Sequence, residues 1–219
     1  MPAEFNNNDA DSSRLSLMRL NTLSDCFFAL ALILLIIFIE KPPADMKPSE
    51  EAIRNYLTGQ FEVVAAYLVT FISIACYWFF THNQGKYLRR SDNIHVWLTL
   101  IVLLFVGFLP FSNALNVAFP GSLTVHLFYS TIVFLVGLLL CIDWLYATRK
   151  DRLVDRKINP EKVNELIVES LVQPIAALIS IGGAFVSTVL WQLPFMLIPV
   201  AIFIINSLWK RQKNHINIE

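Results

Sequence analysis

Charged residues are scarce in this sequence, at 16% of 219 positions, whereas hydrophobic residues make up 56%. Soluble domains carry about 25% charged residues, so this composition excludes an ordinary soluble protein and indicates a membrane protein. The 17 basic and 17 acidic residues cancel, so the net charge gives no information about a nucleic-acid partner, and the distribution of charge along the chain is what is informative. We expect the lipid bilayer, and no nucleic acid, as a partner.

Cysteine is also rare, and the three residues present, Cys26, Cys76 and Cys141, all lie in apolar stretches. An odd number without paired spacing argues against a disulfide framework and a zinc site, so we interpret them as packing residues. The sequence has neither an HExxH metal motif nor a Gly-x-Ser-x-Gly nucleophile elbow. These absences argue against an intramembrane enzyme and predict no cofactor.

Six apolar segments are present, and each is long enough to cross the hydrocarbon core as a helix. They predict an all-α, polytopic membrane protein with six transmembrane helices, located in the plasma membrane. The predicted crossings are residues 23–39, 61–80, 94–118, 123–147, 171–190 and 191–209.

The distribution of basic residues predicts which helix ends face the cytosol. Of the 17 Lys and Arg residues, 14 lie in the two tails and in the second and fourth loops, and three lie in the first loop. The positive-inside rule then places both termini in the cytosol. We divide the chain into a disordered N-terminal tail (1–18), a six-helix transmembrane domain (19–210) and a cytosolic C-terminal tail (211–219).

Two features in the second half of the chain carry structural expectations. Asp143 is the acid of the fourth crossing, and we expect it to pair with Arg149 and Lys150 at the membrane interface. The sequence Trp191-Gln-Leu-Pro194 predicts the corner between the last two crossings, and Gly182-Gly183 permits a close helix approach there.

The first crossing contains one charged residue, Asp25, inside its first turn. A carboxylate costs about 2.5–3.5 kcal/mol at the bilayer centre and less near a helix end, so we expect this residue to be buried with polar partners. The predicted network joins residues near Asp25 in sequence to residues at the same membrane level of the second crossing: Arg19, Ser24, Asp25, Trp78, Thr81 and His82. It could be a structural clamp or a directly functional site.

Three motifs resemble those of a known family. Arg19-x-x-x-Leu23-Ser24-Asp25 is similar to the Arg-x-x-x-Phe-Ser-Asp signature that opens the first helix of the transmembrane protein 175 family, the endolysosomal potassium channels and their prokaryotic relatives. The segments Tyr77-Trp78-x-x-Thr81-His82 and Phe108-Leu109-Pro110-Phe111-Ser112 look like the second-helix and third-helix motifs of that family. The resemblance also covers the organisation into six crossings. Within the family, the sequence resembles the prokaryotic members.

This resemblance implies a potassium-permeable cation channel, assembled as a homotetramer around a central pore for monovalent cations. The first helix of each subunit would line the pore, and the Thr-Val-Gly-Tyr-Gly filter of ordinary potassium channels is absent from this sequence. The resemblance implies an apolar constriction near Ile33, lined by Leu30, Leu34 and Ile37. Ile33 replaces a threonine that is common in the family, which implies modest selectivity for potassium over sodium. Independently, the three lining positions form an i, i+4, i+7 stripe, which is also typical of a packing face.

The intramembrane titratable residues leave an alternative open. Acids and histidines inside membranes mark proton paths, so Asp25 and His82 could form the relay of a proton-coupled secondary transporter. Transporters of this kind contain inverted repeats or broken helices, and neither pattern is clear in this sequence.

Overall fold

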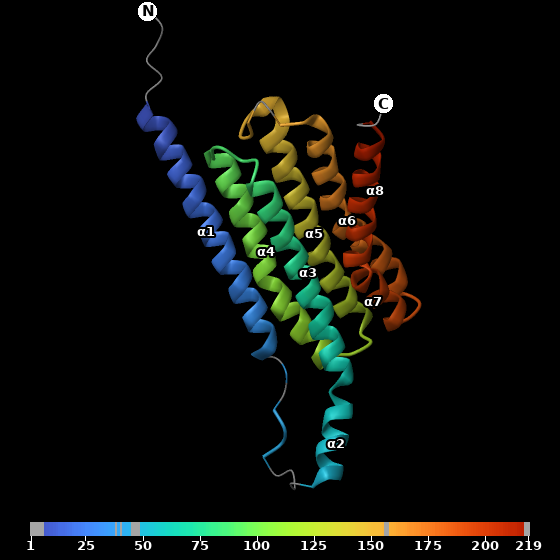
Figure 1. Ribbon diagram of the computed structural model, residues 1–219. Coiled ribbons are helices and arrows are strands. Elements are labelled where there is room, and N and C mark those ends of the chain that lie inside the picture. Colours follow the sequence, from blue (N-terminus) through green and yellow to red (C-terminus); the bar gives the residue numbers. More distant parts are fainter. Residues whose placement is uncertain (1–6, 38, 40, 45–48, 156–157, 217–219) are drawn as a thin grey trace, which may run out of the picture.

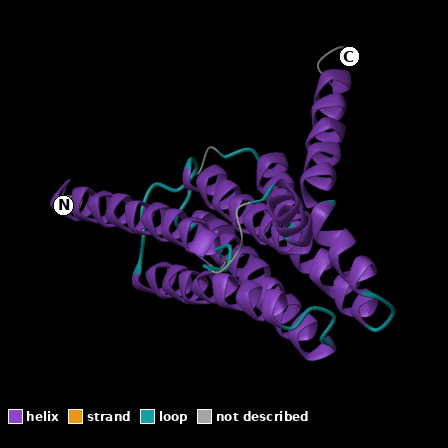
Figure 2. Ribbon diagram, turned by 90° about the horizontal axis from the view of Figure 1, so that it is seen from below, coloured by secondary structure: helices purple, strands orange, loops and turns teal. Residues whose placement is uncertain are grey.

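The computed structural model describes residues 7–37, 39, 41–44, 49–155 and 158–216. Within these ranges the chain consists of helices joined by loops, without strands (Figure 2). The helices are α1 (Asn7–Ile37), α2 (Glu50–Gly59), α3 (Phe61–Gly85), α4 (Asn93–Ala118), α5 (Leu123–Thr148), the 3-10 turn η1 (Arg149–Asp151), α6 (Pro160–Ala184), α7 (Thr188–Met196) and α8 (Ile198–Ile216).

Six helical stretches are long and apolar enough to cross a membrane, which confirms the predicted number of crossings and the all-α class. The sixth crossing combines α7 and α8, which are separated at Leu197. Both ends of the chain lie at the same end of the helical bundle, as an even number of crossings requires (Figure 1). α2 extends beyond the bundle at the opposite end (Figure 1).

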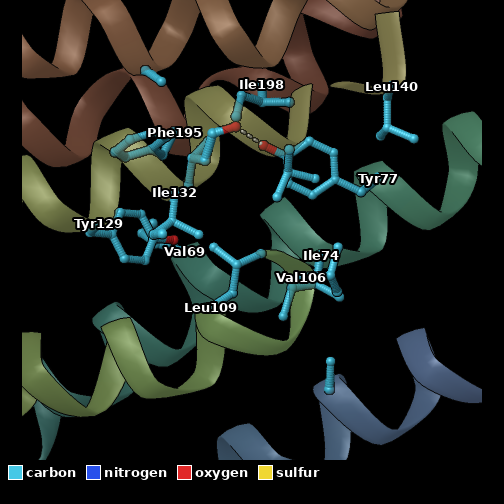
Figure 3. Close-up of a cluster of buried hydrophobic side chains, with 14 of the residues drawn as sticks. Val69, Ile74, Tyr77, Val106, Leu109, Tyr129, Ile132, Leu140, Phe195 and Ile198 are labelled. Atoms are coloured by element: carbon cyan, nitrogen blue, oxygen red, sulfur yellow. Dashed lines mark hydrogen bonds between the residues drawn. The ribbon is translucent and has the colours of Figure 1, made fainter. Parts of the chain in front are cut away.

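The core lies among α3, α4, α5 and the sixth crossing, and two fully buried tyrosines hold these helices together. Tyr77 of α3 donates its hydroxyl hydrogen bond to the backbone carbonyl of Val133 on α5 (Figure 3). The Thr70 hydroxyl on α3 lies 3.0 Å both from Asn113 Oδ1 on α4 and from the Tyr129 hydroxyl on α5. Buried polar groups are tolerated when they bond to one another in this way, so the network specifies how the three helices meet.

Two helices extend further than the sequence predicted. α1 begins at Asn7, in place of the disordered tail expected over 1–18, and residues 1–6 lie outside the described part of the chain. α8 continues to Ile216, although a tail was expected from residue 211. Neither 7–37 nor 200–216 contains glycine or proline, so the backbone can continue as a helix beyond the apolar residues.

The corner between the fifth and sixth crossings lies earlier than predicted. α6 ends at Ala184, and Ser187 caps α7, because its hydroxyl oxygen accepts a hydrogen bond from the Leu190 backbone N–H at 3.2 Å. The prediction of a corner at Trp191–Pro194 is therefore wrong, since both residues lie within α7.

The two adjacent glycines near this corner differ in their surroundings. A Cβ on Gly183 would lie 2.5 Å from the backbone carbonyl oxygen of Leu190, whereas a Cβ on Gly182 would meet nothing within 4 Å. Gly183 therefore permits the close helix approach that was predicted, and Gly182 does not take part in it.

Candidate functional site

α1 lies at the edge of the bundle and packs against α3 and α4 (Figure 1). Its buried residues recur every three or four positions, so they form one face of the helix. These residues are Leu17, Leu20, Ser24, Phe28, Ala31 and Leu35. The opposite face of α1 is not covered by the part of the chain that the structure describes.

The four positions that the family resemblance places at the pore lie on or beside this uncovered face. Leu30, Ile33 and Ile37 are 51%, 61% and 66% exposed, and Leu34 is half-buried. By contrast, Leu35 is completely buried, which shows that α1 has one apolar face inside the chain and another outside it.

The structure brings Asp25 of α1 together with two aromatic residues of α3. The Trp78 indole Nε1 donates a hydrogen bond to Asp25 Oδ1 at 2.8 Å, and the His82 ring stacks on Trp78 with 5.3 Å between ring centroids. These residues lie on consecutive turns of α3, so one helical face presents both rings to α1. Asp25 and His82 are exposed in the single chain, contrary to the expectation that Asp25 would be buried.

The other members of the predicted network do not reach Asp25. Among the described residues, Arg19 forms no ion pair with Asp25 and is exposed. The Ser24 hydroxyl donates to the Leu20 carbonyl at 3.0 Å, and the Thr81 hydroxyl donates to the Trp78 carbonyl at 2.8 Å. These are bonds within one helix, so Trp78 is the residue that ties α3 to the acid of α1 by a side-chain hydrogen bond.

The prediction for Asp143 is wrong. Its Oδ1 lies 2.8 Å from Nδ1 of His95 on α4, and both side chains are almost completely buried. Sequence analysis missed this pair, although the same argument of membrane depth that joined Asp25 to Trp78 applies to it. His95 lies near the start of α4 and Asp143 near the end of α5, and these two helix ends meet at the same level of the bundle.

A cavity of about 280 Å³ connects the two acids. Asp25 lies in its wall on the α1 side, and Asp143 with His95 lies on the α4 and α5 side. Gln84, which also lines the cavity, is buried, and its side-chain nitrogen has no hydrogen-bond partner among the described residues. The cavity is large enough for several water molecules, since each occupies about 30 Å³.

This polar site does not have the composition of a metal centre. Within the described ranges, no group of three or more His, Cys, Asp or Glu residues could hold a metal ion. The three cysteines are free thiols, of which Cys141 is buried and Cys26 exposed.

The part of the chain that carries the motifs matches the model of a known family. The model of the endosomal/lysosomal potassium channel TMEM175 matches residues 19–110, which include the first two motifs and the start of the third. Over residues 19–110 the chain is similar to TMEM175. The Asp25–Trp78 hydrogen bond thus joins the first two TMEM175-like motifs in space.

Relatives and a solved structure extend this TMEM175 similarity beyond residues 19–110. A potassium channel of Streptomyces collinus is 27% identical over 173 residues, which cover 77% of this chain and 82% of that protein. A potassium channel of Chamaesiphon minutus is 24% identical over 172 residues, which cover 77% of this chain and 84% of that protein. The endosomal/lysosomal proton channel TMEM175 of Danio rerio is 23% identical over 203 residues, or 90% of this chain and 38% of that protein.

The fold is also known from experiment. The crystal structure of a homologue of the lysosomal potassium-selective channel TMEM175 from Chamaesiphon minutus superposes with a TM-score of 0.69. The match covers 89% of this chain and 98% of that chain at 20% sequence identity. The six crossings of this protein are therefore arranged as in a TMEM175 channel structure.

Proposed function

We propose that this protein is a potassium-permeable cation channel whose pore is lined by α1 and narrowed by apolar side chains. The names of the Streptomyces and Chamaesiphon relatives, both potassium channels, support this function. The observation that carries the assignment of α1 is its second apolar face, which the chain itself leaves uncovered at Leu30, Ile33 and Ile37.

A pore lined by α1 requires several copies of the chain, because one chain contributes one such helix. We propose a homotetramer, in which four copies of Leu30, Leu34 and Ile37 stack as apolar rings along the axis. Narrow apolar rings repel water, so an ion must give up part of its hydration to pass. Potassium loses water more easily than sodium, which favours potassium, and Ile33 in place of a threonine removes a hydroxyl from this region, so we expect the preference to be modest.

Asp25, Trp78 and His82 then serve as a structural clamp beside the pore helix. Arg19, Ser24 and Thr81, which were predicted to join this network, take no part in the clamp, because among the described residues their side chains do not bond to Asp25. The 2.8 Å bond from the Trp78 indole to Asp25 supports this role, because it fixes α1 against α3. Asp25→Ala should therefore reduce assembly of the tetramer more than it changes ion preference. A well-assembled Asp25→Ala tetramer with inverted selectivity would instead make Asp25 a direct ion site.

The deciding experiment measures permeation of the purified protein in planar bilayers with potassium on one side and sodium on the other. The wild type should give a reversal potential that favours potassium, and Leu30→Ala or Leu30→Asn should raise conductance and move the reversal potential toward zero. Leu32, roughly 200° around the helix from Leu30, is partly buried against the core and provides the control. Leu32→Ala should leave the reversal potential unchanged.

If the exposed stripe of α1 contacts only lipid or another helix, Leu30→Asn will leave permeation unchanged, and the pore assignment will be wrong. Native mass in mild detergent tests assembly separately. A monomer or dimer that retains conduction would remove the tetramer proposal.

The second candidate function is a proton-coupled transporter that uses Asp25 and His82. Trp78 donates a hydrogen bond to Asp25 and stacks on His82, so its chemistry tests whether a proton can pass between the two residues. An indole N–H donates a hydrogen bond but cannot accept one, so Trp78 cannot pass a proton from one residue to the other. This geometry favours the channel. A potassium flux that required an opposing proton gradient in sealed vesicles would favour the transporter.

A further inference from the structure

A second cavity, of about 430 Å³, is lined by residues around the end of α5. This end of α5 lies at the same end of the bundle as the start of α1 and the end of α8 (Figure 1). The cavity is formed by the loop between α3 and α4 and by the end of α5 with η1. Its lining residues are four cations and one aromatic residue: Arg90, Tyr146, Arg149, Lys150 and Arg152. No carboxylate lines it among the described residues.

The two loops that carry these cations are held together by hydrogen bonds. Arg90 Nε donates to the Arg152 carbonyl at 2.6 Å, and the Arg89 backbone N–H donates to the Leu153 carbonyl at 2.9 Å. Leu153 is buried, so the second loop is anchored in the protein. The Arg152 guanidinium lies over the Tyr146 ring, 4.8 Å from its centroid. The cavity is therefore fixed by the fold and does not depend on free loops.

The backbone of η1 directs a further cation into the cavity wall. Lys150 and Asp151 have φ values of 57° and 51°, in the left-handed region that non-glycine residues avoid. The turn places Lys150 in the lining and leaves Asp151 outside it. Unfavourable backbone conformations of this kind persist where the surrounding structure imposes them, and they are frequent at ligand-binding sites.

The charged side chains that line the cavity are all positive, so the cavity suits an anion. Asp92 lies beside the cavity, where it accepts a hydrogen bond from the Tyr146 hydroxyl at 2.6 Å and interacts with the positive charge of Arg152, but it does not line the cavity. Arginine forms paired hydrogen bonds with phosphate oxygens, so three arginines and a lysine suit a phosphate group with several oxygens.

Two exposed apolar side chains lie on the last turns of α5, next to the cavity. Ile142 and Leu145 are 42% and 45% exposed and lie seven and four residues before Arg149, the C-cap of α5. A ligand that fits both surfaces carries a phosphate above a hydrocarbon chain. We propose that the cavity binds the headgroup phosphate of an anionic phospholipid whose acyl chain lies along α5.

The test uses isothermal titration calorimetry. Dioctanoyl phosphatidylglycerol is titrated into the purified full-length protein in dodecyl maltoside micelles, and the dissociation constant is measured. The variant Arg149→Gln/Lys150→Gln removes two cavity cations, both of which are exposed and therefore not part of the core. The matched control, Arg14→Gln/Lys86→Gln, removes two cations that do not line this cavity. Circular dichroism and gel filtration of both variants verify that they remain folded.

Each cation near a membrane surface contributes a factor of about five to anionic lipid affinity, so the cavity variant should bind roughly 25-fold more weakly. The control variant should bind dioctanoyl phosphatidylglycerol with an affinity within about twofold of the wild type. Dioctanoyl phosphatidylcholine, which has no net charge, should bind to the wild type and to the control variant much more weakly than dioctanoyl phosphatidylglycerol does. An equal loss of affinity in the control variant would mean that the lipid responds to the general positive charge at this end of the protein. That result would overturn the proposal that the cavity is the binding site. Glycerophosphoglycerol, which has the same headgroup without acyl chains, should bind much more weakly than the lipid. If it binds with equal affinity, the cavity binds a soluble phosphate compound, and the proposal of a lipid ligand is wrong.

Discussion

Helices α1 and α5 have nearly the same mean hydropathy in their most apolar stretches, 2.2 and 2.3, but they are packed differently. In these stretches 28% of α1 is buried inside the chain, compared with 56% of α5. Hydropathy therefore predicts that each helix crosses the membrane but does not predict what each helix touches there. α5 is the helix around which the chain is packed, and α1 is the helix with a face left for lipid, for another copy of the chain or for a pore.

The acids of the two helices show the same contrast. Asp143 of α5 is buried against His95, whereas Asp25 of α1 is exposed and receives a single indole hydrogen bond from Trp78. Removing one partner of a buried hydrogen-bonded pair leaves the other polar group unsatisfied, which costs more than losing a hydrogen bond at the surface of the chain.

The largest expected effect follows from this difference. Asp143→Ala should lower the free energy of unfolding by about 3 kcal/mol, because it leaves the buried His95 ring nitrogen without a partner, and Asp25→Ala should lower that of the single chain by about 1 kcal/mol. Titration with sodium dodecyl sulfate, followed by circular dichroism, measures both. Equal losses for the two variants would mean that α1 is packed as tightly as α5 in the assembled protein.

A second prediction compares the two faces of α1. Leu35 is completely buried and Leu30 is 51% exposed, so Leu35→Ala should destabilise the single chain by about 2–5 kcal/mol and Leu30→Ala by much less. Both variants should be compared under conditions that keep the protein monomeric. A large loss for Leu30→Ala in the monomer would show that this face packs within the subunit and would weaken its assignment to a pore.

The elements that the sequence predicted correctly are those set by uninterrupted local patterns. The crossings near 61–80, 94–118 and 123–147 follow from long apolar runs, and the structure places helices over each of them. Helix ends were less predictable, because the N-terminal residues from Asn7 are polar yet contain nothing that stops a helix. The corner was misplaced because Pro194 was given more weight than Gly183, whose missing side chain allows the actual close approach.

The candidate site was predictable only where the local sequence carried a motif. Asp25 and Trp78 lie within motifs, and the structure joins them. The His95–Asp143 pair lies outside any motif, and its partners are 48 residues apart on different helices. Arg149 and Lys150 seemed closer to Asp143 along the chain, but they lie beyond the end of α5, whereas Asp143 points into the bundle beside His95. Side-chain direction, which depends on how helices pack, decided this pairing.

A third prediction tests how closely α5 is packed. A Cβ on Gly137 would lie 2.5 Å from Pro174 Cδ on α6, and the rigid proline ring cannot turn away as a flexible side chain would. Gly137→Ala should therefore destabilise the protein by about 1–3 kcal/mol through overpacking. Gly182→Ala is the matched control on α6, since a Cβ there meets nothing within 4 Å. If both alanines are tolerated equally, α5 and α6 are further apart than the structure indicates.

The smallest effect concerns the tie between α5 and the start of α4, which α1 lacks. Asp92 caps α4 by accepting a hydrogen bond from the His95 backbone N–H at 3.0 Å, and it also accepts one from the Tyr146 hydroxyl of α5 at 2.6 Å. Partial burial disfavours the ionised carboxylate, but these hydrogen bonds and the positive charge of Arg152 outweigh it. The pKa of Asp92 is therefore lowered from its ordinary value.

A group whose pKa is lowered by folding stabilises the folded state above its unfolded pKa, about 3.9 for aspartate, and this stabilisation is lost as the pH falls through the folded pKa. Lowering the pH from 5 to 3 should thus lower the midpoint of thermal unfolding more for the wild type than for Asp92→Asn. The asparagine retains an oxygen that can cap α4 but carries no charge to lose, so the two proteins should differ by a constant amount above pH 5 and converge as the pH falls. Thermal unfolding of both proteins in detergent across this range measures the difference. Parallel curves down to pH 3 would show that the Asp92 carboxylate does not contribute through its charge and that the hydroxyl of Tyr146 holds α5 to α4 equally well when its acceptor is neutral.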